Sequence, residues 1–233
     1  MDKGAPFRLN IIMSCNRFDF ILSALCFTNR EVPCEDGFLQ MRQLEEAWNQ
    51  NMDQQFLPSW INVIDEYMKW SNKWAPGFLC VGRKPHPFGN EWHTFCCALT
   101  TILWRAQIVE GKDRPTELGK KKWEELGKTV GLMLQICEPI FSTGKCVVLD
   151  SDFCVSKGIT ALLEFGFYAA ALIKKRKYWL KGVLGDTIDE YFADKDITHV
   201  DMLEAITEEG PEGKAFNIFC FKEPEYVMKI MAT

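Results

Sequence analysis

Two aspartates in this chain of 233 residues stand where carboxylates could bind a metal ion. Asp65 lies in the alternating segment 60–69, on a face that the pattern shares among Ile61, Val63 and Tyr67. A carboxylate on an apolar face costs several kcal/mol unless it is paired or coordinates a metal. Asp150 directly follows the apolar run 146–149, which suits a central strand. Ligand sites of open α/β sheets form outside the carboxyl ends of such strands.

Two carboxylates on adjacent central strands would repel each other, and a divalent cation would relieve that repulsion. Hard oxygen ligands suit Mg²⁺ or Mn²⁺. We therefore predict that the carboxyl groups of Asp65 and Asp150 lie within about 8 Å of each other, the reach needed to share a pair of metal ions. Two alternatives remain open: Asp65 as a solvent-exposed edge or bulge residue, and Asp150 as a helix N-cap or turn residue.

The elements that must position these residues follow from hydrophobic periodicity. A 3.6-residue period predicts helices over 14–26, 41–54, 116–137 and 156–165. Apolar and alternating runs predict strands over 60–69, 78–82, 92–105, 146–149, 167–173, 200–206, 215–221 and 226–231. This order favours an α/β fold, a mixed sheet with helices on its faces. We expect a helical segment, 1–57, before a core over 58–233 that is truncated at its C-terminus.

Composition places the chain among globular proteins, with 47% apolar and 25% charged residues. It has no apolar run of about 18 residues and no signal-peptide layout, so we expect an intracellular protein without a membrane span and with reduced thiols. The net charge is −5, yet residues 185–213 hold ten acids and one lysine. The rest of the chain is therefore net positive, and it contains the basic cluster Lys174, Lys175, Arg176 and Lys177, followed by Lys181. Such a run is usually a solvated face, and contact with phosphates is the alternative.

Other chemistries find little support. The sequence contains no G-x-G-x-x-G and no G-x-S-x-G motif, and Lys122 stands where a phosphate-binding loop ending at Thr129 needs its first glycine. We therefore expect no nucleotide cofactor. His93, Cys96 and Cys97 could suggest a zinc site, but neighbours on one strand point to opposite faces, which favours buried thiols.

Five short motifs, in order along the chain, resemble those of piggyBac transposases and their domesticated derivatives. A helical segment opens with Met13-Ser14-Cys15-Asn16-Arg17-Phe18, and Ile64-Asp65-Glu66 resembles the I-D-E of the family. Lys84-Pro85-His86-Pro87-Phe88-Gly89 is similar to K-P-x-x-(Y/F)-G, and Leu149-Asp150-Ser151-Asp152-Phe153 to D-N-x-F. The fifth is the strand with the basic run after it, Ala170 to Lys174 and beyond. Each motif alone is weak, whereas five in order are a strong signal.

The resemblance implies a ribonuclease H-like fold and metal-dependent cleavage and transfer of DNA strands. It implies that Asp65 and Asp150 are catalytic metal ligands of a site for two Mg²⁺ or Mn²⁺ ions. Arg83, Lys84 and the basic residues of 174–181 become candidate DNA contacts. The implied partners are transposon ends and target DNA, a homodimer is one expected assembly, and the implied location is the nucleus.

The chain also departs from the family pattern. The family uses a third aspartate after a further pair of strands, and a cysteine-rich zinc-binding tail, and no residue here matches either. One hypothesis is therefore an incomplete transposase core. A second is a catalytically inactive, transposon-derived protein that binds DNA or protein, and a third is a metal-free α/β domain unrelated to DNA.

Overall fold

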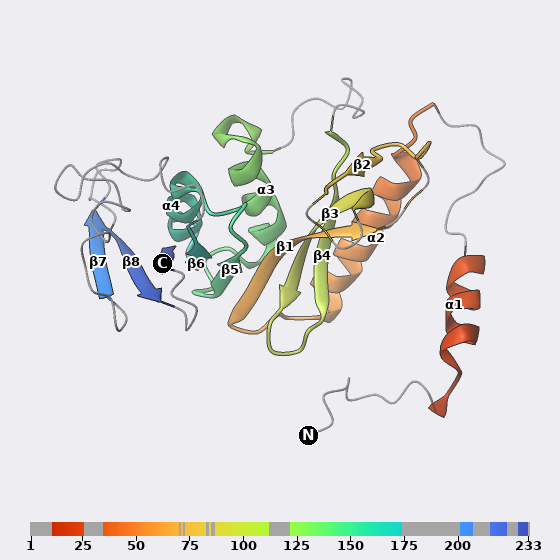
Figure 1. The fold of residues 1–233 in the computed structure, drawn as a ribbon, viewed down its shortest axis with the longest axis horizontal. Helices are drawn as coiled ribbons and strands as arrows, with labels where there is room; N and C mark the ends of the chain where they lie inside the picture. The colour runs from red at the N-terminus through yellow and green to blue at the C-terminus, as the bar shows by residue number, and fades with distance from the viewer. Residues whose placement is uncertain are drawn as a thin grey trace.

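A computed structural model describes residues 11–25, 35–69, 71, 73–82, 84, 87–111, 122–173, 201–206, 215–222 and 228–232. Its described strands form one mixed sheet in the order β2-β3-β1-β5-β6-β9-β8-β7, with β4 paired to β3 as well. Helices flank this sheet (Figure 1), as the order of elements predicts. No helix within the described part of the chain is long and apolar enough to span a membrane.

The centre of the sheet is strand β1 (Ile61–Lys69), which lies between β3 (Phe88–Cys97) and β5 (Cys146–Leu149). It runs antiparallel to β3 and parallel to β5. The last residue pair between β1 and β5 is Ile64 with Leu149, so the second half of β1 extends beyond the end of β5. The residue that follows Ile64 and the residue that follows Leu149 therefore lie at the same edge of the parallel pair.

The sheet continues from β5 to β6 (Tyr168–Leu172), which is parallel to it, in line with the prediction of a buried strand over 167–173. Strand β9 (Met228–Ala232) pairs antiparallel with β6, and β8 (Ala215–Lys222) and β7 (Asp201–Ile206) follow. These are the strands predicted near 200–206, 215–221 and 226–231. They extend the mixed sheet beyond its parallel centre.

The single strand predicted over 92–105 is wrong. Strand β3 ends at Cys97 and β4 (Leu103–Ile108) returns antiparallel beside it. The backbone N–H of Thr101 donates to the carbonyl of Cys97, and Thr101 takes a positive φ of 58°. The connecting residues include no glycine, proline or asparagine to mark a turn, so the apolar run conceals the hairpin. Strand β2 (Leu79–Cys80) pairs with the start of β3, as expected for 78–82.

Helix α2 (Leu39–Gln55) covers the free edge of β4 (Figure 1). The backbone N–H of Ala106 donates to Asn49 Oδ1 at 3.0 Å, and Asn49 Nδ2 donates to the carbonyl of Ala106 at 2.9 Å. One turn earlier, Glu45 accepts from the N–H of Ile108. These side chains satisfy backbone groups that an edge strand would leave open to another chain. The helix predicted over 41–54 is thus confirmed, and it is bonded directly to the sheet.

The helix predicted over 116–137 is shorter in the structure. Residues 112–121 lie outside the described part, and the remainder is divided into a 3-10 turn (η4, Glu124–Leu126) and α3 (Lys128–Cys137). Gly127 separates them with φ 101°, a conformation that favours glycine. Within helix α3, the residues Val130, Met133, Leu134 and Cys137 are buried.

Two other helices lie close to their predicted positions. Helix α1 (Cys15–Ala24) begins after Ser14, whose Oγ accepts from the N–H of Arg17 as an N-cap. Helix α4 (Ser156–Glu164) packs against α3 and β6. The core lies between α3, α4 and the sheet and includes Ile64, Phe95, Leu134, Val147 and Leu162, each fully buried.

Candidate metal centre

The structure brings Asp65 and Asp150 together from two neighbouring parallel strands. Asp65 is the first residue of β1 after its last pairing with β5, and Asp150 is the first residue after β5 ends. The backbone N–H of Asp150 continues the ladder by donating to the carbonyl of Ile64 at 3.4 Å. Their carboxylates lie within 4.8 Å of each other, which satisfies the expected 8 Å. The geometric prediction on which the metal hypothesis depends is therefore confirmed.

A third carboxylate, that of Glu66, joins this pair. One oxygen from each of Asp65, Glu66 and Asp150 lies within 4.8 Å of the others. Sequence reasoning missed Glu66 as a ligand because consecutive strand residues point to opposite faces of a sheet. The available signal was its place beside Asp65 in the Ile64-Asp65-Glu66 motif. Glu66 lies beyond the end of β5, and its longer side chain reaches the same space from the other face.

Lys84 is the cation that contacts this cluster. Its Nζ lies 3.0 Å from Glu66 Oε1 and also donates to the backbone carbonyl of Glu66 at 3.3 Å. The side chain of Glu66 is 4% exposed and that of Lys84 is 23% exposed. The electrostatic attraction within an ion pair this shielded from water is greater than within a surface pair. Lys84, which the sequence indicates as a DNA contact, is therefore bonded to the acidic cluster in this structure.

The pKa values of two adjacent carboxyl groups in the cluster, Asp65 and Glu66, are shifted in opposite directions. Asp65 is exposed as a residue, yet the burial of part of its carboxyl group raises its pKa. The backbone N–H of Glu66 opposes that rise by donating to Asp65 Oδ1 at 2.7 Å. The carboxyl group of Glu66 adds to the rise. Burial also acts to raise the pKa of Glu66, but the hydrogen bond and charge of Lys84 outweigh it and hold this pKa below its usual value. The carboxylates of Asp65 and Glu66 therefore repel each other, and the charge of Lys84 compensates only part of this repulsion.

The prediction that Asp65 occupies the packed face of its strand is wrong. The alternation of β1 is present, but Ile64, Glu66 and Met68 are buried while Asp65 and Tyr67 are exposed. Both faces of the segment carry apolar residues, so the pattern indicates two faces without indicating which one packs against the core. The exposed position opens Asp65 to solvent, where a large substrate could approach it.

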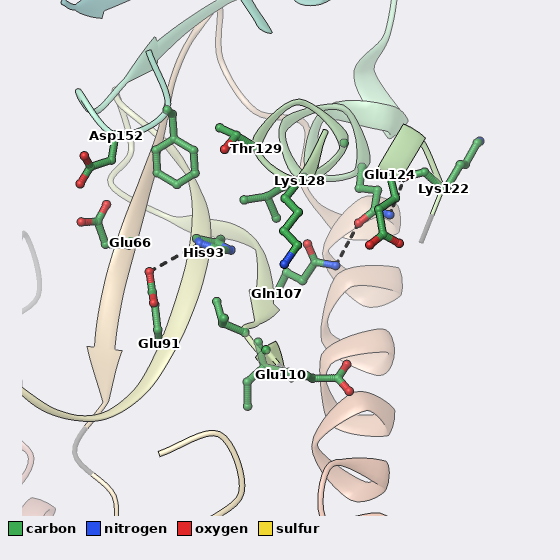
Figure 2. Close-up of a pocket in the computed structure, with 17 residues that line it drawn as sticks. Glu66, Glu91, His93, Gln107, Glu110, Lys122, Glu124, Lys128, Thr129 and Asp152 are labelled. Atoms are coloured by element: carbon green, nitrogen blue, oxygen red, sulfur yellow. Dashed lines mark hydrogen bonds and ion pairs between the residues drawn. The ribbon is translucent and has the colours of Figure 1, made fainter. Parts of the chain in front are cut away.

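The buried face of β1 borders a cavity of about 430 Å³ between the sheet and α3. Figure 2 shows Glu66, Glu91, His93 and Asp152 on its sheet side and Lys128 on α3. The cavity lining carries five acids and two lysines in all, with Glu110, Glu124 and Lys122 completing the set. An excess of carboxylates disfavours anionic ligands in this cavity.

The remaining predicted site residues fall into two groups. Arg83, Lys174, Lys175, Arg176, Lys177 and Lys181 lie outside the described residues, so their proposed contacts with DNA stay predictions. For the zinc alternative, His93 lies opposite Glu66 in the β-ladder and its Nε2 is 3.6 Å from Glu91 Oε1. Among the described residues, the group of His, Cys, Asp and Glu side chains close enough to hold a metal is the carboxylate cluster, and Cys96 and Cys97 are not part of it.

Three carboxylates at this spacing fit a hard divalent cation. Their oxygen donors are those that Mg²⁺ and Mn²⁺ prefer, and a bound cation would neutralise the repulsion among the three carboxylates. Asp65, Glu66 and Asp150 are the residues that could hold it.

Asp65→Asn is expected to stabilise the metal-free chain at neutral pH. The pKa of Asp65 lies above its usual 3.8, so the folded chain holds this proton more tightly than the unfolded chain, and stability falls as pH rises through the folded pKa. The variant should gain less than about 1 kcal/mol because the site is exposed. Urea unfolding in a chelator measures this gain, which should shrink toward about pH 4. A variant less stable than the parent at neutral pH would contradict the electrostatic account.

Comparisons with known proteins agree with this geometry. A family model described as Transposase IS4 matches residues 4–196. A cryo-EM structure of a piggyBac transposase synaptic complex with hairpin DNA superposes with a TM-score of 0.65 and 15% sequence identity. The match covers 99% of this chain and 45% of that chain, so this chain spans less than half the length of its structural relative. A search of curated proteins finds no match.

These matches confirm the resemblance inferred from the motifs. The mixed sheet is that of a ribonuclease H-like core, in which β4, β3, β1, β5 and β6 lie side by side. Because the family model covers most of the sequence, the chain belongs to the Transposase IS4 family, with the fold of a piggyBac transposase core.

Proposed function

We propose that this chain is the metal-binding core of a piggyBac-like DNA transposase. The observation that carries the proposal is the convergence of Asp65 and Asp150, within 4.8 Å, at the edge where the pairing of two adjacent parallel strands ends. The substrate class is duplex DNA, the reaction is cleavage and transfer of a strand, and Mg²⁺ or Mn²⁺ is the cofactor. A nuclear location follows from that substrate.

In this proposal Asp65 and Asp150 act as ligands and not as proton-transfer groups. Bound divalent ions would activate the attacking water or 3′-hydroxyl and stabilise the leaving oxygen in an in-line displacement. Asp65 presents its carboxylate on the exposed face of β1, which leaves room for a DNA backbone. The basic residues Arg83, Lys174, Lys175, Arg176, Lys177 and Lys181 are proposed to hold phosphates, which positions DNA without reading its sequence.

The direct test is nicking of a supercoiled plasmid and of a labelled transposon-end duplex. Nicked product is expected with Mg²⁺ or Mn²⁺ and not in a chelator, and Asp65→Asn should abolish it while leaving the fold intact by circular dichroism. Product that forms equally with Asp65→Asn would contradict the proposed ligand role, because that activity could not come from this centre.

The second candidate function is that of a catalytically inactive, transposon-derived protein that binds DNA or protein without cutting. This candidate predicts DNA binding that weakens steeply with salt, measured by fluorescence anisotropy, with no metal-dependent nicking.

A further inference from the structure

The acidic cluster contains one carboxylate more than the pair predicted from the motifs, and a lysine is bonded to it. Glu66 is nearly enclosed, with its side chain 4% exposed, yet one of its oxygens lies within 4.8 Å of ligand oxygens of both Asp65 and Asp150. A carboxylate removed from water to this extent needs a cation near it. The position of Glu66 is therefore suited to a metal ligand as well as to an ion pair.

Lys84 supplies a cation that is part of the chain. Its Nζ bonds to Glu66 twice, to Oε1 of the side chain and to the backbone carbonyl, which places the ammonium group beside the cluster. A carboxylate has two oxygens and can accept from a lysine while its other oxygen faces a metal ion. The ion pair with Lys84 thus leaves Glu66 able to contact a metal.

We infer that Glu66 is a third metal ligand and that Lys84 is its counter-cation, which lowers the negative charge of the centre. The inference deepens the proposed function and rests on it. The ammonium group of Lys84 removes one unit of negative charge from three ionised carboxylates, which weakens the attraction of the centre for every cation and most strongly for highly charged ones.

The charge role and a purely structural role of Lys84 predict opposite results. If Lys84 tunes charge, Lys84→Met should tighten Mn²⁺ binding about tenfold, because a repelling cation a few ångströms from the ion is lost. The gain should grow with ion charge, to about 30-fold for trivalent Tb³⁺. If Lys84 merely holds Glu66 in place, the same variant should bind both ions more weakly.

The experiment measures free Mn²⁺ by electron paramagnetic resonance and bound Tb³⁺ by luminescence, on the full chain. Lys84→Arg keeps the charge and should bind both ions like the parent. Lys145→Met is the matched control, because it removes the same charge at the opposite end of β5, where Lys145 Nζ donates to the carbonyl of Pro58. Its affinity for both ions should change less than about twofold.

Glu66→Gln tests the other half of the inference. It should weaken Mn²⁺ binding about tenfold, and the gain from Lys84→Met should shrink in the Glu66→Gln background, because the two residues act as a pair. Melting curves confirm that each variant is folded before its affinity is measured.

The outcomes separate this inference from the proposed function. Mn²⁺ binding that depends on Asp65 and Asp150 but is unchanged or weaker in Lys84→Met would overturn the counter-cation role and leave the metal centre standing. Unchanged binding in Glu66→Gln would remove Glu66 from the ligand set. A parent chain that binds neither ion would overturn both the inference and the proposed function.

Discussion

Asp150→Asn is expected to weaken Mn²⁺ binding by this chain at least about 100-fold, because loss of an outer-shell partner alone costs 10–100-fold at typical metal sites. Asparagine keeps the size of the side chain and removes its charge. The backbone at this position stays held by the N–H bond from Asp150 to the carbonyl of Ile64 and by the turn in which the N–H of Phe153 donates to the Asp150 carbonyl. Titration of free Mn²⁺ by electron paramagnetic resonance measures the change.

The matched control for this substitution lies two residues further on. Asp152 belongs to the same loop but lines the cavity and is not part of the three-carboxylate cluster. Asp152→Asn removes the same charge from the same loop, so only long-range electrostatics should act, with an effect below about threefold. Equal losses in the two variants would mean that the loop provides general negative potential and no ligand.

Phe95→Ala is expected to lower the free energy of unfolding by about 3–5 kcal/mol, which is a large part of the stability of a typical domain. Phe95 is fully buried on β3, lies opposite Ile64 of β1 and packs edge-on against Trp104 with ring centroids 5.3 Å apart. Its removal would leave a cavity behind the strand that carries Asp65. Unfolding in guanidinium chloride measures the loss.

Phe88 provides the comparison on the same strand. It is 51% exposed and stacks on Phe78, at a centroid distance of 6.3 Å. Phe88→Ala should cost about 1 kcal/mol, since little apolar area returns to water. Similar costs for the two phenylalanines would show that the sheet is not packed around Phe95 as described.

Features that depend on local chain properties could be predicted from the sequence. The alternation over 61–69 and the apolar run 146–149 both form the expected strands. The proximity of Asp65 and Asp150 was also predictable, because ligand residues gather at the edge where a buried parallel strand such as 146–149 ends beside its neighbour. The family motifs supported the same pair of residues independently.

Features that depend on packing could not be predicted. Both faces of β1 carry apolar residues, so only tertiary contacts decide that Glu66 is buried and Asp65 is exposed. The hairpin after Cys97 and the break at Gly127 interrupt runs whose periodicity continues through them. In each case the local pattern permits two arrangements, and contacts distant in sequence select one.

The sequence by itself determined the family, the central strands and the pair of aspartates, because motif order and strand periodicity are properties of the chain alone. Only the tertiary structure added Glu66 and Lys84 to the centre. Their contribution depends on where β5 ends beside β1 and on a lysine 18 residues away in the chain, at 3.0 Å in space. Neither quantity follows from periodicity, since both are set by how separate segments pack together.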